Sequence, residues 1–395
     1  MTNETKNVPE LRFPEFDGEW EEKQLSTILE IGTGKSKVQS NENGKYNILG
    51  STGIIGKSHT YDYEGDFILT ARVGHYAGKL YKHSGKVNIS DNTIYLFNFI
   101  NKNFIYESLN VVKLEKLVFG SGQPLIKASD LKKLKILVPV SKEQQKIGEF
   151  FSKLDRQIEL EEQKLAKLEE QKQGYMQKIF SQELRFKDEN GNEYPEWESK
   201  KIEELFNLID GDRGKNYPSD KDFYDKGHTL FLDTGNVTKN GFLFNRNRFI
   251  NKEKDDILRN GKLELNDFVI TSRGTLGNIG FYGQNIHHKY PNIRINSAML
   301  ILRPLNNKFN YQYLYFLLKD DAIDTFMKHY RVGSAQPHIT KKDFGNMKIS
   351  VITDVNEQRK IAKSLTTLDK LVINQSNKVE SLKQRKQGLL QKMFI

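Results

Sequence analysis

An internal duplication constrains this 395-residue chain more than any other feature, because a repeated frame predicts two similar modules rather than one fold. Six strings recur in the same order: a QG-x-x-QK-x-F string that ends each repeat, and five before it. They pair as follows: LRF at Leu11 with LRF at Leu184, WE at Trp20 with WE at Trp197, GDFILTARVG at Gly65 with NDFVITSRGT at Asn266, GSGQPLIKASDLKKLKI at Gly120 with GSAQPHITKKDFGNMKI at Gly333, and EQQKIGEFFSKLD at Glu143 with EQRKIAKSLTTLD at Glu357.

The distances between equivalent residues show which parts of the repeat diverged. Trp20 and Trp197 lie 177 residues apart, Arg72 and Arg273 lie 201 apart, and the QG-x-x-QK-x-F strings end 214 apart, at Phe180 and Phe394. The second module has therefore gained about three dozen residues in its interior while the repeat ends stayed in register. This pattern predicts two copies of one scaffold that recognise two different targets.

The last quarter of each repeat predicts a long helix with the four-three apolar spacing of a coiled coil. Eight of ten seam positions are apolar in each helix, and the polar ones fall at equivalent places, Glu161 and Lys172 in the first helix and Gln375 and Lys386 in the second. We expect the two helices of one chain to pair antiparallel, with the modules at opposite ends, although pairing between chains is an alternative. The seam residues expected to pair are Leu154, Ile158, Leu165, Leu168, Leu368, Val372, Val379 and Leu382.

Each module is predicted to mix strands and helices. Short β-branched and aromatic runs, such as 66–71, 93–97, 267–272 and 298–302, alternate with Gly and Asn and predict strands. Helical patterns follow at 102–117 and 311–329. The expected fold class is α+β, with two mixed α/β modules related by duplication and separated by two long helices.

The charge and composition narrow the classes of partner. The formal net charge of +10 favours a polyanion, because binding to a phosphate backbone releases counterions. The helical stretches 143–180 and 357–394 hold 8 acids with 7 bases and 3 acids with 9 bases, so they carry −1 and +6 and the rest carries +5. With no cysteine, no signal-peptide pattern and no long apolar run, the chain is expected to be cytoplasmic, without a thiolate metal site.

Two pairs of loops combine basic, aromatic and glycine residues in a way that suits DNA. The first pair follows the 66–71 and 267–272 strands, and an ordinary structural hairpin is the alternative for any single residue. The second pair is the GSGQP and GSAQP turns, which are either structural or phosphate-contacting. The candidate DNA contacts are Arg72, His75, Tyr76, Lys79, Ser121 and Gln123 in the first module and Arg273, Thr275, Asn278, Arg331, Ser334 and Gln336 in the second, with Lys82 and Tyr282 beside them.

The catalytic motifs that the chain suggests are incomplete. The string LEIGTGKS at Leu29 resembles a phosphate-binding loop, but that loop needs glycine at its first position and a helix after it. The histidines show no metal-ligand spacing, and no Asn-Pro-Pro-aromatic string of an adenine methyltransferase is present. We expect no catalytic residue, no metal and no cofactor in this chain.

With these helices, duplicated WE strings and GSxQP loops, the chain resembles the specificity subunits of type I restriction-modification enzymes over nearly its full length. The resemblance implies target recognition domains at 1–141 and 182–353, a central helix at 142–181 and a closing helix at 354–395. It also implies that the chain reads a bipartite, asymmetric DNA site, and that the helices set the unread spacer.

The resemblance further implies the partners. Two modification subunits would bind S-adenosylmethionine and methylate adenine, and restriction subunits would use ATP and Mg²⁺, so these cofactors belong to the partners. A coiled-coil adaptor that binds only proteins is the alternative function. It accounts for the helices but not for the paired modules.

Overall fold

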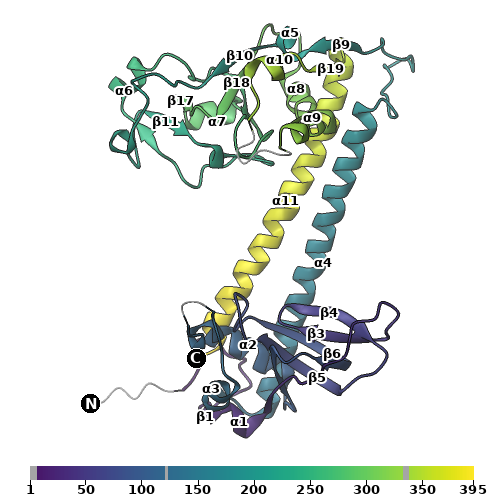
Figure 1. Cartoon of the computed structure of the whole chain (residues 1–395), viewed down its shortest axis with the longest axis vertical. Helices are drawn as coiled ribbons and strands as arrows, with labels where there is room; N and C mark the ends of the chain where they lie inside the picture. The colour runs from purple at the N-terminus through teal and green to yellow at the C-terminus, as the bar shows by residue number, and fades with distance from the viewer. Residues whose placement is uncertain (1–6, 121–122, 332–337) are drawn as a thin grey trace. The chain divides into compact units, whose positions relative to one another are not determined.

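The computed structural model describes residues 7–120, 123–331 and 338–395. The chain divides into two compact units, Met1–Leu165 with Gln375–Ile395, and Ala166–Asn374. Both division points lie within long helices, α4 (Ser141–Phe180) and α11 (Val355–Met393), so each unit contains a part of both helices (Figure 1). The two mixed α/β modules and the two long helices agree with the predicted fold class.

The first unit is built around a six-stranded sheet in the order β2-β7-β5-β6-β3-β4, in which only the β3–β6 pair is parallel among the named strands. A separate antiparallel pair joins β1 to β8. The elements before α4 are β1 (Glu21–Gln24), α1 (Leu25–Ile28), β2 (Glu30–Thr33), β3 (Tyr46–Gly50), β4 (Gly53–Ser58), β5 (Tyr63–Ala71), β6 (Leu80–Ile89), β7 (Thr93–Phe97), α2 (Lys102–Val112), the 3-10 helix η1 (Leu114–Leu117), α3 (Ala128–Lys133) and β8 (Lys135–Val138).

The second unit distributes its strands over smaller sheets. Its main sheet has the antiparallel order β10-β18-β15-β16, beside a three-stranded sheet β14-β11-β17 and the pairs β12-β13 and β19-β9. The elements are β9 (Glu198–Lys201), α5 (Ile202–Leu205), β10 (Phe206–Asp210), η2 (Asp220–Asp222), β11 (Thr229–Leu232), η3 (Thr234–Asn236), β12 (Val237–Thr238), β13 (Gly241–Phe242), β14 (Phe249–Ile250), α6 (Lys252–Ile257), β15 (Phe268–Thr271), β16 (Ile279–Phe281), α7 (Gln284–Lys289), β17 (Ile293–Ile295), β18 (Met299–Pro304), α8 (Tyr311–Leu317), α9 (Asp321–Arg331), α10 (Lys341–Gly345) and β19 (Lys348–Val351).

Each core is completed by the end of the long helix that begins in the other half of the sequence. In the first unit, the Phe394 ring stacks on Phe104 with centroids 5.5 Å apart and meets the edge of Trp20 at 6.1 Å. In the second unit, Phe180 contacts Trp197 at 6.3 Å and Tyr313 at 6.4 Å. The recurring WE and QK-x-F strings are therefore the two sides of one aromatic contact, made once in each unit.

A buried ion pair explains why the LRF string recurs. Arg12 bonds the carboxylate of Glu143 through Nε at 2.8 Å and Nη2 at 2.6 Å, and Glu143 is fully buried at the first turn of α4. Arg185 approaches the equally buried Glu357, in the first turn of α11, at 3.2 Å. Both arginines also donate to backbone carbonyls of the neighbouring turn. Removing either arginine would leave a carboxylate buried without its charge partner.

The helices run antiparallel within each unit. In the first unit, Gln375 Nε2 donates to both the backbone oxygen and the carboxylate of Glu161, at 2.9 and 2.7 Å. In the second, Lys172 forms an ion pair with Asp369. The polar seam positions of the two helices thus find polar partners, and all eight predicted seam leucines, isoleucine and valines are buried or half-buried.

The lysines at equivalent seam positions have different surroundings. Lys386 bonds to Asp155 at 2.6 Å and to Glu107 at 2.9 Å, with Lys82 completing a cluster of two cations and two anions. Burial lowers the pKa of Lys386, but its bonds to Asp155 and Glu107 outweigh burial and raise it.

In the second unit, the corresponding cluster has one carboxylate fewer. Lys172 pairs with Asp369, while Lys319 lies 4.9 Å from the ring centroid of Tyr315 and 3.3 Å from its hydroxyl. Burial and the charge of Lys172 lower the pKa of Lys319 to about 8, against the opposing effect of Asp369. Holding Lys319 in this place therefore costs stability when it is charged.

We predict that Lys319→Met raises the free energy of unfolding near neutral pH, by no more than about 3 kcal/mol. Above pH 8 the folded chain releases the proton that the unfolded chain keeps until about pH 10.5, so the wild-type chain gains stability over this window. The difference between the two proteins should shrink as pH rises from 8 to 10.5. Urea unfolding at several pH values measures it. A constant difference would contradict the assigned pKa.

Candidate nucleic-acid interface

The first predicted loop connects β5 to β6 and exposes the side chains expected to meet DNA. Arg72, His75, Tyr76 and Lys79 are all exposed, and the Lys79 ammonium lies 4.8 Å from the Tyr76 ring centroid. Gly74 and Gly78 have φ of +84° and +85°, so the two bends of the loop use backbone conformations that favour glycine. The loop therefore presents one guanidinium, one imidazole and one cation-aromatic pair to the surroundings.

The GSGQP turn lies against this loop. The Gly74 amide donates to the Pro124 carbonyl at 2.8 Å, and the Ile126 amide donates to the Arg72 carbonyl at 2.9 Å. Gln123 is exposed on the turn, whereas Ser121 lies outside the described residues. Two strings that are about fifty residues apart in the sequence thus form one surface.

Lys82, also a sequence candidate, has a structural role. Its ammonium lies 4.4 Å from the Tyr106 ring centroid and 3.8 Å from the Asp155 carboxylate, inside the charge cluster of α4 and α11. Burial lowers the pKa of Lys82, although Asp155 and Glu107 oppose this shift. Lys82 is therefore not a candidate DNA contact.

The equivalent turn of the second unit connects β15 to β16. The Ile339 amide donates to the Ser272 carbonyl at 3.0 Å, and Arg273 forms a β-bridge with His338. Arg273 and Thr275 are exposed. Of the other candidates, Ser334 and Gln336 lie outside the described residues, as does the side chain of Arg331, whose backbone ends α9.

The backbone contacts shift the equivalence of the two arginines by one residue. Ser272, not Arg273, takes the place of Arg72, because its carbonyl accepts from Ile339 as that of Arg72 accepts from Ile126. Likewise, Arg273 bridges His338 where Val73 bridges Leu125.

The cores confirm this shift. In the first unit, Ile68 packs in the core that contains α2. In the second unit, Phe268 and Ile270 pack in the equivalent core, which contains α8. The sequence alignment pairs Phe268 with Phe67, but Phe67 packs in the other core of its unit. Val269 faces the opposite core. Because side chains alternate along a strand, a one-residue shift turns each aligned residue to the other face. Aligning Arg72 with Arg273 was therefore wrong in structural terms.

Two further candidates of the second unit are engaged in the fold. The side-chain amide of Asn278 donates to the Val237 carbonyl at 2.9 Å, and the backbone amide of Asn278 donates to the Thr271 hydroxyl at 3.0 Å. Tyr282 is fully buried, and its hydroxyl donates to the Tyr290 carbonyl at 2.6 Å. Arg273 and Thr275 are thus the candidates of this turn with exposed side chains.

The loops that carry Arg72 and Arg273 are called the arginine loops below. A second loop lies next to each of them, and the sequence analysis did not include it among the candidate DNA contacts. In the loop after β2, the Gly34 amide donates to the Thr93 carbonyl at 2.9 Å. The neighbouring Asn92 carbonyl, in the same turn, accepts from the Arg72 amide. The exposed Lys35 and Lys37 follow Gly34. The loop after β10 begins with Gly211 and exposes Arg213 and Lys215. The signal was the spacing of 177 residues between Gly34 and Gly211, which equals that between Trp20 and Trp197.

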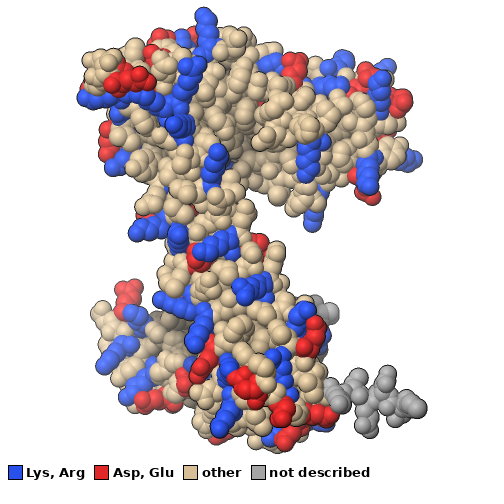
Figure 2. Space-filling view, turned by 180° about the vertical axis from the view of Figure 1, so that it is seen from behind, with Lys and Arg blue, Asp and Glu red and all other residues tan. Residues whose placement is uncertain are grey.

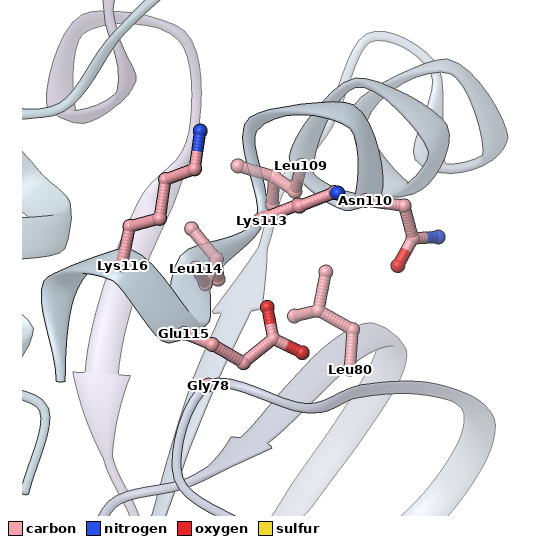
Figure 3. A pocket seen from close by; sticks show the side chains of 8 residues that line it. All are labelled: Gly78, Leu80, Leu109, Asn110, Lys113, Leu114, Glu115 and Lys116. Carbon is pink, nitrogen blue, oxygen red and sulfur yellow. The ribbon is translucent and has the colours of Figure 1, made fainter. Parts of the chain in front are cut away.

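A cavity of about 480 Å³ lies behind the arginine loop of the first unit (Figure 3). Leu80, Leu109 and Leu114 line it together with Lys113 and Glu115. Glu115 is the one carboxylate among its lining residues, so this cavity offers no pair of carboxylates for general acid–base catalysis.

On the face that Figure 2 shows, charge does not define a binding surface. Figure 2 shows basic and acidic side chains interspersed over both units on the face in view. Within the described ranges, no cluster of three or more His, Cys, Asp or Glu residues suits a metal ion. In the same ranges, no helix is long and apolar enough to cross a membrane. The arginine loops and the neighbouring loops after β2 and β10 are thus the candidate DNA-binding features.

Comparison with known families gives a match over most of the chain. A family model described as "Type I restriction modification DNA specificity domain" matches residues 17–170 and again residues 194–384. The two matched ranges correspond to the two repeats.

Several known proteins are similar in sequence. The type I restriction enzyme MjaVIII specificity subunit of Methanocaldococcus jannaschii is 26% identical over 218 residues, which cover 54% of this chain and 46% of that protein. The chain thus spans about half the length of this relative. The putative type I specificity subunit S.MgeORF438P of Mycoplasma genitalium is 26% identical over 289 residues, or 71% of this chain and 67% of that one.

Two solved structures share the fold. The crystal structure of a type I restriction-modification system S subunit from M. genitalium superposes with a TM-score of 0.66 at 19% identity, covering 98% of this chain and 99% of that one. A subunit from a structure of type I restriction-modification complex assembly and conformational transition gives 0.53 at 16% identity, covering 95% and 97%.

We predict that Asn278→Ala lowers the free energy of unfolding by about 1 to 2 kcal/mol, because it leaves the carbonyl of the buried Val237 without its donor. Thr275→Ala, at an exposed position of the same turn, should change it by less than about 0.5 kcal/mol. Urea unfolding of both variants checks this. Equal effects would show that the Asn278 bond does not support the turn.

Proposed function

Because the chain belongs to the type I restriction modification DNA specificity family, we propose that it is the subunit that reads DNA sequence in a type I restriction-modification complex. One observation carries the proposal: both units place an arginine loop and a basic loop on the same turn of a common frame, yet differ by one residue in register. Such modules can bind the same polymer while reading different bases. The site would therefore be bipartite and asymmetric.

We propose that the chain contributes recognition but no chemistry. Methyl transfer from S-adenosylmethionine and ATP- and Mg²⁺-dependent cleavage would belong to modification and restriction subunits. Exposed apolar residues on α4 and α11, namely Leu160, Tyr175, Leu371 and Ile373, support protein partners on the helices. A cytoplasmic location would follow from the DNA substrate.

A coiled-coil adaptor without DNA reading is the competing function. It would use the same helices, but it gives no reason for exposed cations to recur beside the same turn in both units. An electrophoretic shift assay on the complex with its modification subunits separates the two functions, because phosphate binding weakens steeply with salt. Absence of any sequence preference in that assay would support the adaptor.

We predict that Arg72→Ala and Arg273→Ala each weaken binding to the cognate duplex by about 1 to 3 kcal/mol, if each guanidinium pairs with a guanine. Both side chains are exposed, so the melting temperature should not change. Fluorescence anisotropy at physiological salt measures the affinities. Unchanged affinity in both variants would assign the two arginines to the fold instead.

Replacing residues 1–141 with the equivalent domain of a relative should change one half of the methylated site and leave the other half as it was. The reason is that each unit holds its own pair of loops. Mapping of methylated adenines in a host that carries the chimaera and the modification subunit reads out both halves. A change in both halves would contradict independent recognition.

A further inference from the structure

We propose that the basic loops after β2 and β10, residues 34–38 and 211–215, bind DNA backbone phosphates and hold the neighbouring arginine loops against the bases. The inference rests on the proposed function and adds residues that the resemblance did not indicate. It gives a role to the string GTGKSK, whose likeness to a nucleotide-binding loop was otherwise unexplained.

The first of these loops is fixed to the turn that also holds Arg72. The Gly34 amide donates to the Thr93 carbonyl at 2.9 Å, and the Ser36 amide donates to the Ile89 carbonyl at 3.0 Å. Arg72 donates its amide to the Asn92 carbonyl at 2.8 Å. The turn between β6 and β7 therefore joins the two loops through backbone bonds on either side.

The second unit repeats this arrangement with a different sequence. Here a side chain makes the first bond: the Arg213 guanidinium donates to the Ser297 carbonyl at 3.3 Å. The next carbonyl, that of Ala298, accepts from the backbone amides of Ser272 and Arg273 at 2.8 and 3.2 Å. The turn between β17 and β18 thus joins the loop after β10 to the Arg273 loop.

Close backbone approach explains the glycine that begins each loop. A Cβ atom on Gly34 would lie 2.2 Å from the Ser90 carbonyl oxygen, and one on Gly211 would lie 2.1 Å from that of Asn296. These distances are far inside van der Waals contact, so both positions need glycine to keep the loop on its turn. The same close approach, at equivalent places in two diverged modules, indicates that the position of the loop matters in both.

The side chains that follow these glycines carry positive charge toward the surroundings. In the first unit, Lys35 and Lys37 are exposed and form no ion pair with the described residues. The nearby acidic groups are Asp62, which accepts from the Ser36 hydroxyl at 2.5 Å, and the exposed Asp91 of the turn. With Arg72 next to them, the cations outnumber these carboxylates.

In the second unit, Lys215 is likewise exposed without an ion pair in the described ranges, and Arg259 lies beside Gly214. Two acidic residues share the loop. Asp210 pairs with Arg213 at 3.2 Å, and Asp212 is buried and accepts from the amides of Gly214 and Arg259, both at 2.7 Å. The hydrogen bonds of Asp212 shape the loop and leave Lys215 and Arg259 facing outward.

A nucleotide is the other phosphate compound that such a string suggests, and the fold argues against it. A phosphate-binding loop of that class opens a helix, whose amides hold the anion. Residues 34–45 instead lead to strand β3 without an intervening helix. Lysines beside an arginine loop suit the repeated phosphates of a duplex, which fix the position of a protein without selecting bases.

The test compares Lys35→Ala/Lys37→Ala with wild type in the complex with modification subunits, on a cognate and an unrelated duplex. We expect both affinities to fall about tenfold or more, their ratio to stay constant, and the slope of log K against log salt to decrease by about 1 to 2. Lys215→Ala should lower the slope by about 1. Lys35→Arg/Lys37→Arg should keep the affinity, because it keeps the charges.

Lys142→Ala/Lys153→Ala is the matched control, since it removes two exposed lysines of the same unit from α4. The phosphate role is wrong if wild type prefers the cognate duplex but the Lys35/Lys37 variant has the same affinity and salt slope as this control. An altered base preference would also overturn it, in favour of base reading. If wild type shows no sequence preference at all, the proposed function itself fails.

Discussion

The structure depends on how each unit completes its core with the end of a helix from the other half of the sequence. Phe394 fills the space between Trp20 and Phe104, and Phe180 contacts Trp197 and Tyr313 in the same manner. A module without that phenyl ring would expose a large aromatic surface to water. The long helices are therefore part of each module's core as well as connections between the two sequence repeats.

The polar positions of the helix seam add specificity to this apolar contact. Glu161 meets Gln375, and Lys386 meets Asp155 and Glu107, so a helix displaced by one turn would bury these groups without partners. The second unit keeps the lysine and the aspartate, but among the described residues no carboxylate forms an ion pair with Lys319, whereas Glu107 pairs with Lys386 in the first unit. The shared contacts hold the frame, and the differences record where the two copies diverged.

The sequence predicted the elements with strong periodicity and missed those whose neighbours are distant in the chain. The heptad spacing was enough for the helices, and the repeated strings were enough for the two modules. The partners of Asn278, Tyr282 and Lys82 could not be predicted, because each contact depends on a segment whose place only the fold determines. For the same reason, the lysines after Gly34 were not selected, although their spacing from Gly211 was visible in the sequence.

The one-residue shift between the two arginine loops has a consequence for engineering. The strands before them, with Phe67–Ala71 and Phe268–Thr271 buried throughout, lack the polar alternation that would show which face each residue takes. A graft that exchanged these loops by matching letters would place Arg72 where Val73 belongs. The hybrid would then hold its guanidinium at the backbone position that bridges His338, one residue beyond the position whose carbonyl accepts from Ile339. Exchange of recognition segments within such a chain should follow the backbone hydrogen bonds instead, with Ser272 taken as the counterpart of Arg72.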